Sequence, residues 1–191
     1  MKTVKSILTI FLAMAMALSM AACSGSNTGK SSTDVNMTAQ EVLDAVKNSL
    51  GDSYTSDTAE TEDRMTGYYG LDMSRIDSWA AESNSNPSLS MDCTVILKVK
   101  DGYAKDAAAL LQQSYEQVRD YAKMYNMDLY RVLQGRLFIN GDYVALIIEG
   151  KEADYNASEE DQAAFARDEA AKTDAAWKDI FGSAENTLSA S

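Results

Sequence analysis

The chain has 191 residues, of which 29 are acidic and 17 basic, and it contains no histidine, so its formal net charge is −12. The missing histidine excludes a Ser-His-Asp or Cys-His nucleophile pair, a histidine zinc ligand and a histidine general base. The acidic balance disfavours binding to phosphate backbones, and we expect no nucleic-acid partner.

The first 22 residues are typical of a bacterial signal peptide. Lys2 and Lys5 give a positive start, and residues 7–20 form an apolar segment that is too short to span a membrane readily. The small residues directly before Cys23 resemble the lipobox of bacterial lipoproteins, in which the cysteine sulfur receives a diacylglycerol and the chain is cut just before it. The resemblance implies that Cys23 becomes a lipidated N-terminus on the extracytoplasmic face of the cell membrane. The alternative is an ordinary secretion signal in which Cys23 is incidental.

The remaining chain divides by composition. Residues 24–33 contain no large apolar side chain and cannot bury enough surface to offset their conformational entropy. We therefore assign residues 23–36 to a flexible polar tether. The nearly charge-balanced middle holds the strand-like sequence and the flanks hold most of the acid, so we assign residues 37–150 to the folded domain and 151–191 to an acidic, alanine-rich helical extension.

The first half of the domain begins with a helix. Thr38 and Glu41 have the spacing of a capping box, apolar residues follow at helical spacing, and Gly51 is a typical stop. The polar and acidic residues 52–63 indicate a loop. Residues 75–82 fit a strand or a short helix, of which we favour the strand. Residues 91–100 alternate in polarity, which predicts a strand with one apolar face; Ile96 on the other face indicates that this face is partly covered.

The second half predicts a long helix and a hairpin. Residues 103–126 carry an apolar stripe at helical spacing. Asn140-Gly141 between two apolar runs predicts a type I′ turn in which Leu137 faces Val144 and Phe138 faces Tyr143. Both faces of this hairpin are apolar, so the long helix should cover one face and a terminal helix the other. Residues 153–181 read as that C-terminal helix. The stripe that should face the sheet in the long helix consists of Ala107, Leu110, Leu111, Ser114, Val118, Tyr121, Ala122 and Tyr125. The residues expected to anchor the C-terminal helix are Phe165, Ala166, Ala170 and Trp177.

These elements predict an α+β fold: a small antiparallel sheet of three to four strands packed on a long amphipathic helix, with flanking N- and C-terminal helices. The order of lipobox, polar tether, strand 91–100, helix 103–126 and the Gly141-Asp142-Tyr143-Val144 hairpin resembles the bacterial lipoproteins grouped as domain of unknown function 4358. The resemblance covers about residues 37–150. That family has no assigned activity, so the resemblance implies a fold and no chemistry.

Motifs for catalysis or cofactor binding are missing. The sequence contains no Ser-x-x-Lys pattern, no G-x-S-x-G elbow and no glycine-rich phosphate loop, and the segment from Asp154 departs from a calcium loop at the required glycine. We therefore expect no catalytic residues, no cofactor and no metal site. The acidic run Glu159-Glu160-Asp161 is expected to be a solvated helix face, and Cys93 a small buried side chain rather than a reactive thiol.

One aromatic group is left over from the predicted core. Tyr68, Tyr69 and Trp79 form a possible surface for stacking on a sugar or a peptide; the alternative is that they cover an open face of the sheet. Three further residues, Arg119, Arg131 and Arg136, form either a basic spot or ordinary surface salt bridges.

Three hypotheses for function follow. The first is a non-enzymatic, lipid-anchored binding or scaffold module in the cell envelope, with an envelope protein as a possible partner. The second is a single-lobe ligand-binding accessory lipoprotein of a transporter. The third is an envelope hydrolase that uses carboxylates. An exposed apolar patch would favour the first, a preformed cavity with a few polar groups the second, and a deep pocket with two desolvated acids the third.

The anchor yields a direct prediction. The substitution Cys23→Ser removes the sulfur that would carry the lipid, so the protein should move into the medium or accumulate as an uncleaved precursor. Detergent phase partitioning of cells expressing either form is the measurement. Partitioning of the variant into detergent at the wild-type level and size would contradict the anchor.

Overall fold

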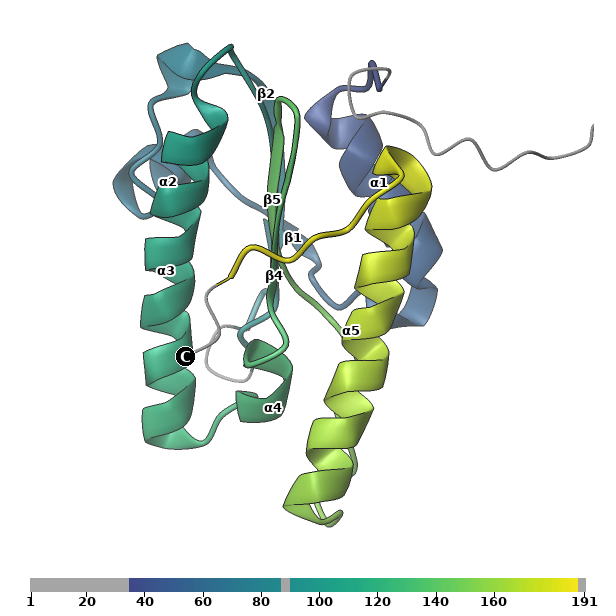
Figure 1. Cartoon of the computed structure of the whole chain (residues 1–191). Coiled ribbons are helices and arrows are strands. Elements are labelled where there is room, and N and C mark those ends of the chain that lie inside the picture. Colours follow the sequence, from purple (N-terminus) through teal and green to yellow (C-terminus); the bar gives the residue numbers. More distant parts are fainter. Residues whose placement is uncertain (1–34, 87–89, 189–191) are drawn as a thin grey trace, which may run out of the picture.

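Five strands form one antiparallel sheet, and helices cover both of its faces (Figure 1). The computed structural model describes residues 35–86 and 90–188, so Cys23 and the segments 1–34, 87–89 and 189–191 lie outside the described residues. The strand order is β1-β2-β3-β5-β4. The bounds are β1 (Thr58–Ala59), β2 (Ile76–Ser83), β3 (Cys93–Val99), β4 (Arg136–Asn140), β5 (Tyr143–Ile148), α1 (Ala39–Leu50), α2 (Glu62–Gly67), α3 (Ala104–Tyr125), α4 (Leu129–Val132) and α5 (Glu159–Phe181), with 3-10 turns at Gly51–Ser53 and Met73–Arg75.

The predicted α+β class with flanking helices is confirmed, and the sheet has one strand more than the upper prediction. The additional elements are β1, α2 and α4; the first two lie in or overlap the segment 52–63 that was predicted to be a loop. Both are too short to leave a periodic pattern in the sequence. Strand β1 contributes only two paired residues at the edge of the sheet, next to β2.

Helix α1 begins and ends as its sequence predicts. The Glu41 carboxylate accepts a hydrogen bond from the Thr38 amide at 2.7 Å, and the Thr38 side chain accepts from the Glu41 amide at 3.2 Å. The helix ends at Gly51, whose φ of 52° disfavours other residues. Its apolar stripe is buried against the sheet and α5; the stripe consists of Ala39, Val42, Leu43, Val46 and Leu50.

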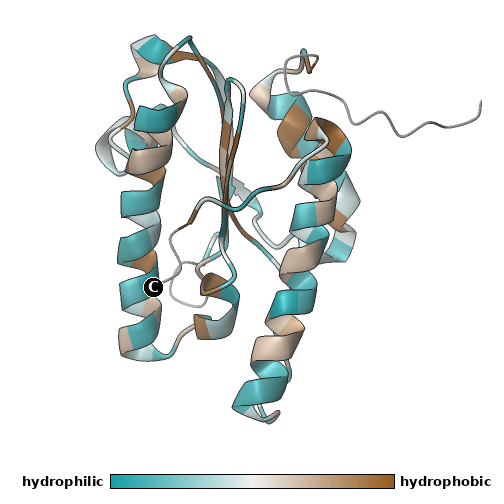
Figure 2. Cartoon of the chain, viewed as in Figure 1, coloured by the Kyte–Doolittle hydropathy of each residue, from teal (hydrophilic) through white to brown (hydrophobic). Residues whose placement is uncertain are grey.

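The sheet separates two apolar layers. On one face the odd-numbered residues of β3 pack beneath α3, and on the other Ile96 packs with α1 and α5. We expected this face to be only partly covered at Ile96, but the Ile96 side chain is fully buried. Figure 2 shows brown stretches along the central strands and a mixture of teal and brown residues along the helices on either side. Burial on both faces explains why the hairpin strands are apolar at nearly every position.

The hairpin turn differs from the prediction by one position. Asn140 pairs with Tyr143 as part of the ladder, so Gly141 and Asp142 are the loop residues and Leu137 faces Leu146. Only Gly141 has a positive φ, of 60°, which fits a type II′ turn rather than type I′. Asn140 stays extended because its side chain accepts a hydrogen bond from Trp177 Nε1 at 2.7 Å and donates one to Ser183. The predicted division of the hairpin into two faces is correct, because the shift in pairing preserves side-chain alternation.

The apolar stripe of α3 ends earlier than predicted. Tyr121 and Tyr125 are 46% and 60% exposed, whereas Tyr115, outside the predicted stripe, is buried. The Tyr115 hydroxyl donates to the Val132 carbonyl at 3.0 Å, so this ring fixes α4 to α3. In the last turns of α3, which lie beside α4 (Figure 1), Ala122 is fully buried, whereas the Tyr121 and Tyr125 rings lie against each other at 4.5 Å on the exposed side.

Helix α5 is part of the core rather than a solvated addition. Trp177 and Phe181 are buried among Phe138, Tyr143 and α1, and the Trp177 ring stacks on Phe138 at 5.0 Å. Ala166, Ala170 and Trp177 are buried as expected, but Phe165 is 37% exposed and is not an anchor. Helix α5 thus forms the second layer together with α1.

Within residues 35–86 and 90–188, no helix combines the length and apolar content that a membrane crossing requires.

The packing of α5 predicts a large effect of one substitution. Trp177→Ala removes a fully buried ring and its hydrogen bond to Asn140, and should lower the free energy of unfolding by about 3–5 kcal/mol. Trp177→Phe keeps most of the packing and should cost less, about 1–3 kcal/mol. Urea unfolding measures both. If Trp177→Ala lowers the free energy of unfolding by less than Trp177→Phe does, α5 is not part of the cooperative core.

Candidate functional site

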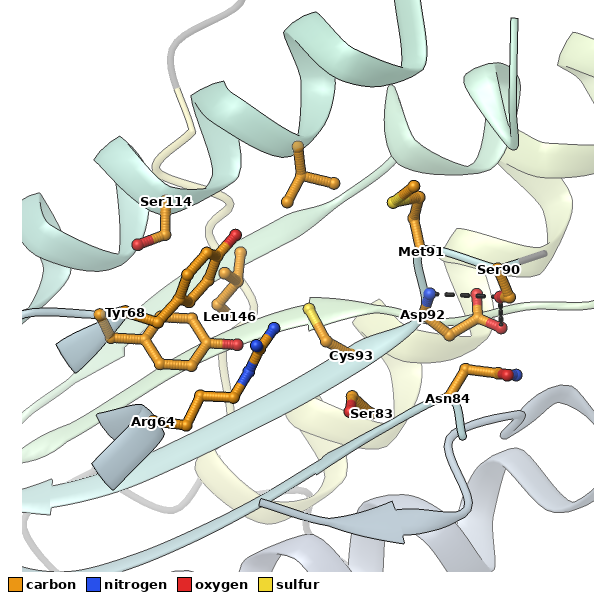
Figure 3. A pocket seen from close by; sticks show the side chains of 12 residues that line it. Arg64, Tyr68, Ser83, Asn84, Ser90, Met91, Asp92, Cys93, Ser114 and Leu146 are labelled. Atoms are coloured by element: carbon orange, nitrogen blue, oxygen red, sulfur yellow. Dashed lines mark hydrogen bonds between the residues drawn. The ribbon is translucent and has the colours of Figure 1, made fainter. Parts of the chain in front are cut away.

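Tyr68 and Tyr69 lie beside a small pocket between α2, α3 and the strands β2 and β3, which we call the tyrosine pocket (Figure 3). Its volume is about 110 Å³. Tyr69 is buried, Tyr68 is 40% exposed, and the two rings meet edge to face at 4.9 Å. The Arg64 guanidinium lies 4.4 Å above the Tyr68 ring. The predicted third member, Trp79, does not line the pocket and packs instead against the α3 layer.

Cys93 lines the tyrosine pocket with its sulfur but is a poor nucleophile. Burial raises the pKa of its thiol far above the ordinary value, and the carboxylates of Glu149 and Asp92 raise it further. The thiol therefore remains protonated at neutral pH. The expectation of a small buried side chain is confirmed.

A buried group of charges, which we call the ion cluster, lies at the far end of the tyrosine pocket. It consists of Arg131, Asp92 and Asp128, whose side chains are 7%, 1% and 9% exposed. Arg131 Nη2 lies 2.8 Å from Asp128 Oδ2, and Arg131 Nε lies 2.9 Å from Asp92 Oδ1, the latter without the alignment of a hydrogen bond. Arg131 Nη1 also donates to the Gly150 carbonyl at 2.9 Å.

The predicted basic spot does not form. Arg119 pairs with Asp120, Arg136 pairs with Asp174, and Arg131 is buried in the ion cluster. The alternative of ordinary salt bridges applies to Arg119 and Arg136, whereas the burial of Arg131 was not predicted.

Local backbone geometry positions the ion cluster. Asp128 precedes α4 with a φ of 50°, a conformation that Asp tolerates better than most residues, and its carboxylate accepts from the Met91 amide at 2.8 Å. Gly150 has a φ of 138°, and a Cβ there would meet the Glu169 Cβ at 3.0 Å. A glycine is thus required where the chain leaves β5 and presents its carbonyl to Arg131.

Glu149 forms a second buried acid next to the ion cluster. Its carboxylate accepts hydrogen bonds from the Thr55 and Ser56 amides and from the hydroxyls of Thr55, Ser56 and Thr94. The Thr55 hydroxyl also lies 2.6 Å from Asp92 Oδ2, so it bridges the two acids. This arrangement attaches the segment after α1 to the ends of β3 and β5.

The pKa values of both acids are raised. For Glu149, burial raises the pKa to about 7; the charge of Asp92 adds to the increase, while the hydrogen bonds from Ser56, Thr55 and Thr94 oppose it. For Asp92, burial raises the pKa and Arg131 opposes the increase. Glu149 lines neither of the pockets described here, and the Asp92 carboxylate is engaged by Ser90, Thr55 and Arg131. The two acids therefore act as a clamp on the backbone.

A larger pocket lies on the other side of Arg131, between α4, the segment after β5 and the start of α5. We call it the α4–α5 pocket, and its volume is about 350 Å³. The buried residues Arg131 and Ala166 and the nearly buried Asp128 side chain line it together with the half-buried Tyr130 and the exposed Tyr155. Its other lining residues are Asn126, Leu129, Lys151, Glu152, Ala153, Glu159 and Gln162.

The sequence contained a partial signal for this region. Asp92 and Glu149 directly precede and follow strands that are buried on both faces, where a charged residue needs a partner. Nothing local indicates which residue supplies that partner, because Arg131 reaches Asp92 only through the tertiary fold.

The described residues contain no group of three or more metal-ligating side chains. Glu159, Glu160 and Asp161 form the first turn of α5 after the Ser158 cap, where negative charge favours the helix.

Compared with known proteins, the chain matches no family model, no curated protein and no solved structure.

The raised pKa of Glu149 predicts a pH-dependent stability. Between pH 4.5, the ordinary value, and about 7, the folded protein retains a proton that the unfolded chain has released. This group should therefore make the free energy of unfolding fall as the pH rises through that window, with no further change above it. Urea unfolding at pH 5 and pH 8 measures the difference.

The matched variants are Glu149→Gln and Glu62→Gln. The first replaces the titrating group by an amide that can still accept from the backbone amides, and should reduce the pH dependence; the second removes an exposed acid on α2. An equal pH dependence in the wild type and in Glu149→Gln would contradict the assignment.

Proposed function

We propose that the chain is a lipid-anchored extracytoplasmic binding protein, held at the cell membrane through Cys23, which binds its ligand in the α4–α5 pocket and does not transform it. The lipobox-like sequence before Cys23 supports the anchor. The pocket and its rigid floor support the binding role.

The observation that carries this proposal is the position of the pocket relative to the entry of the chain. Tyr143, at the hairpin end of β5, donates its hydroxyl to the Met37 carbonyl at 2.6 Å and accepts from the Met37 amide at 3.0 Å. The α4–α5 pocket begins beyond the opposite end of β5, at Lys151. A strand of six residues spans about 20 Å. The elements that line the pocket, α4 and the start of α5, therefore lie at the opposite end of the sheet from residues 35–37 (Figure 1).

The floor of the pocket is fixed before any ligand arrives. Arg131 is held by two carboxylates, a hydroxyl and a backbone carbonyl, so it cannot rotate without losing buried contacts. A preformed floor lowers the entropic cost of binding.

The geometry ranks the three hypotheses. A pocket of about 350 Å³ has the size of a small-ligand site and favours a binding module, including the single-lobe accessory protein of a transporter. Tyr155, 90% exposed at the pocket, supplies an aromatic contact for an envelope protein in the scaffold version. Two desolvated acids exist, as a carboxylate hydrolase requires, but Glu149 lines neither described pocket. The resemblance to the domain of unknown function 4358 adds no chemistry to this ranking.

The proposal predicts which position on the protein should cross-link to the bound ligand. A photo-reactive amino acid at position 155, beside the pocket, should form adducts on intact cells, whereas the same group at the exposed Lys105 on α3 should not. Mass spectrometry of the adduct measures its size. A small-molecule adduct supports the ligand-binding version, and a single envelope protein supports the scaffold version. Equal labelling from both positions, or none from position 155, would contradict a binding role for this end of the molecule.

A further inference from the structure

We infer that the ligand of the α4–α5 pocket is a small organic cation, a primary ammonium group on a short carbon chain. This inference rests on the proposed function, because it names the ligand class of the same pocket.

The charge at the pocket floor is the first argument. Arg131 is the only buried cation among its described lining residues, and two buried carboxylates, from Asp92 and Asp128, already face it. Arg131 is therefore already paired with two carboxylates, of which Asp128 lines the pocket, and it offers no uncompensated positive charge there. A carboxylate at such a place is stabilised by any additional positive charge that approaches it.

The walls of the pocket add further negative charge. Glu152, from the segment after β5, lies 3.8 Å from Arg131 Nη2, and Glu159, at the start of α5, engages the Tyr130 hydroxyl. The remaining cation, Lys151, extends its ammonium to within 3.5 Å of Asp52, a residue that does not line the pocket. The acids of the pocket therefore outnumber the cations that can compensate for them.

An anionic ligand does not fit the same pocket. Arg131 is the group that would receive it, but its guanidinium already serves Asp92, Asp128, Ser90 and the Gly150 carbonyl. An incoming carboxylate would have to displace a buried acid and would face Glu152 and Glu159.

The remaining lining suits the carbon chain of such a cation. Leu129, Ala153 and Ala166 supply apolar surface, and the rings of Tyr130 and Tyr155 supply faces on which an ammonium group is attracted. The volume of about 350 Å³ admits a short chain and leaves no room for a folded domain. The lining therefore fits a ligand that carries a positive charge on a short carbon chain.

Three probes of equal length test the inference. Calorimetric titration of the purified full-length chain at 150 mM salt should detect binding of butane-1,4-diamine, but none of butane-1,4-diol or succinate at the same concentrations. Capped lysine, which carries the same ammonium on a peptide backbone, distinguishes a free amine from a lysine side chain as the source. Binding of succinate in preference to the diamine would overturn the inference, as would equal binding of the diol.

Matched variants locate the site. Glu152→Gln and Glu159→Gln should each weaken diamine binding about fivefold, the scale of one partly exposed charge contact. Glu160→Gln removes the same charge from the same turn of α5 but at a residue that does not line the pocket, and should leave binding within about twofold. Equal weakening by all three variants would mean general attraction to an acidic protein and would overturn the site.

The test of the cationic ligand can fail without a failure of the proposed binding function. Adducts from position 155 on intact cells, without diamine binding in the calorimeter, would overturn the cationic ligand and leave the binding protein standing. Absence of both would remove the binding role itself.

Discussion

The structure of the sheet end depends on the burial of Arg131 between Asp92 and Asp128. This arrangement joins three parts that are distant in the sequence: the start of β3, the short helix α4 and the exit of β5 at Gly150. Removing one partner from a buried ion pair leaves an uncompensated charge, which is far more costly than the pair is stabilising. The position of α4, the turn into α5 and the wall between the tyrosine pocket and the α4–α5 pocket therefore all depend on one guanidinium group.

The hydrogen bonds of Glu149 extend this network to the segment after α1. By accepting hydrogen bonds from residues 55 and 56, it fixes the segment that links α1 to the edge of the sheet. The shared Thr55 hydroxyl couples this clamp to Asp92. The protonation of Glu149 is therefore coupled to Asp92 both by the direct repulsion of their charges and through the shared Thr55 hydroxyl.

The hydrophobic periodicity of the sequence predicted the two apolar layers of the fold. It did not predict the contacts at the two ends of the sheet. Alternation in residues 91–100 and 143–148 assigned the core faces correctly, because side-chain direction in a strand depends only on parity. The turn was misplaced because Asn140 is held by Trp177, a contact over 37 residues that no local pattern contains. The exposure of Tyr121 and Tyr125 and the burial of Arg131 were missed for the same reason. Tyr68 and Tyr69 were selected because the predicted core did not use them, and they do line a pocket, whereas Trp79 is partly buried and packs against the core.

The two bonds between Tyr143 and Met37 have a mechanical consequence. A pull on residues 35–37 passes along the backbone into α1, and through these two bonds part of it also reaches the hairpin end of β5. Strand β5 is flanked by β3 and β4, so such a pull loads both ladders in shear, where all their hydrogen bonds resist together, rather than peeling them one at a time. Such a pull would break the two hydrogen bonds between Met37 and Tyr143 before the two ladders of β5, so the sheet would keep its shape.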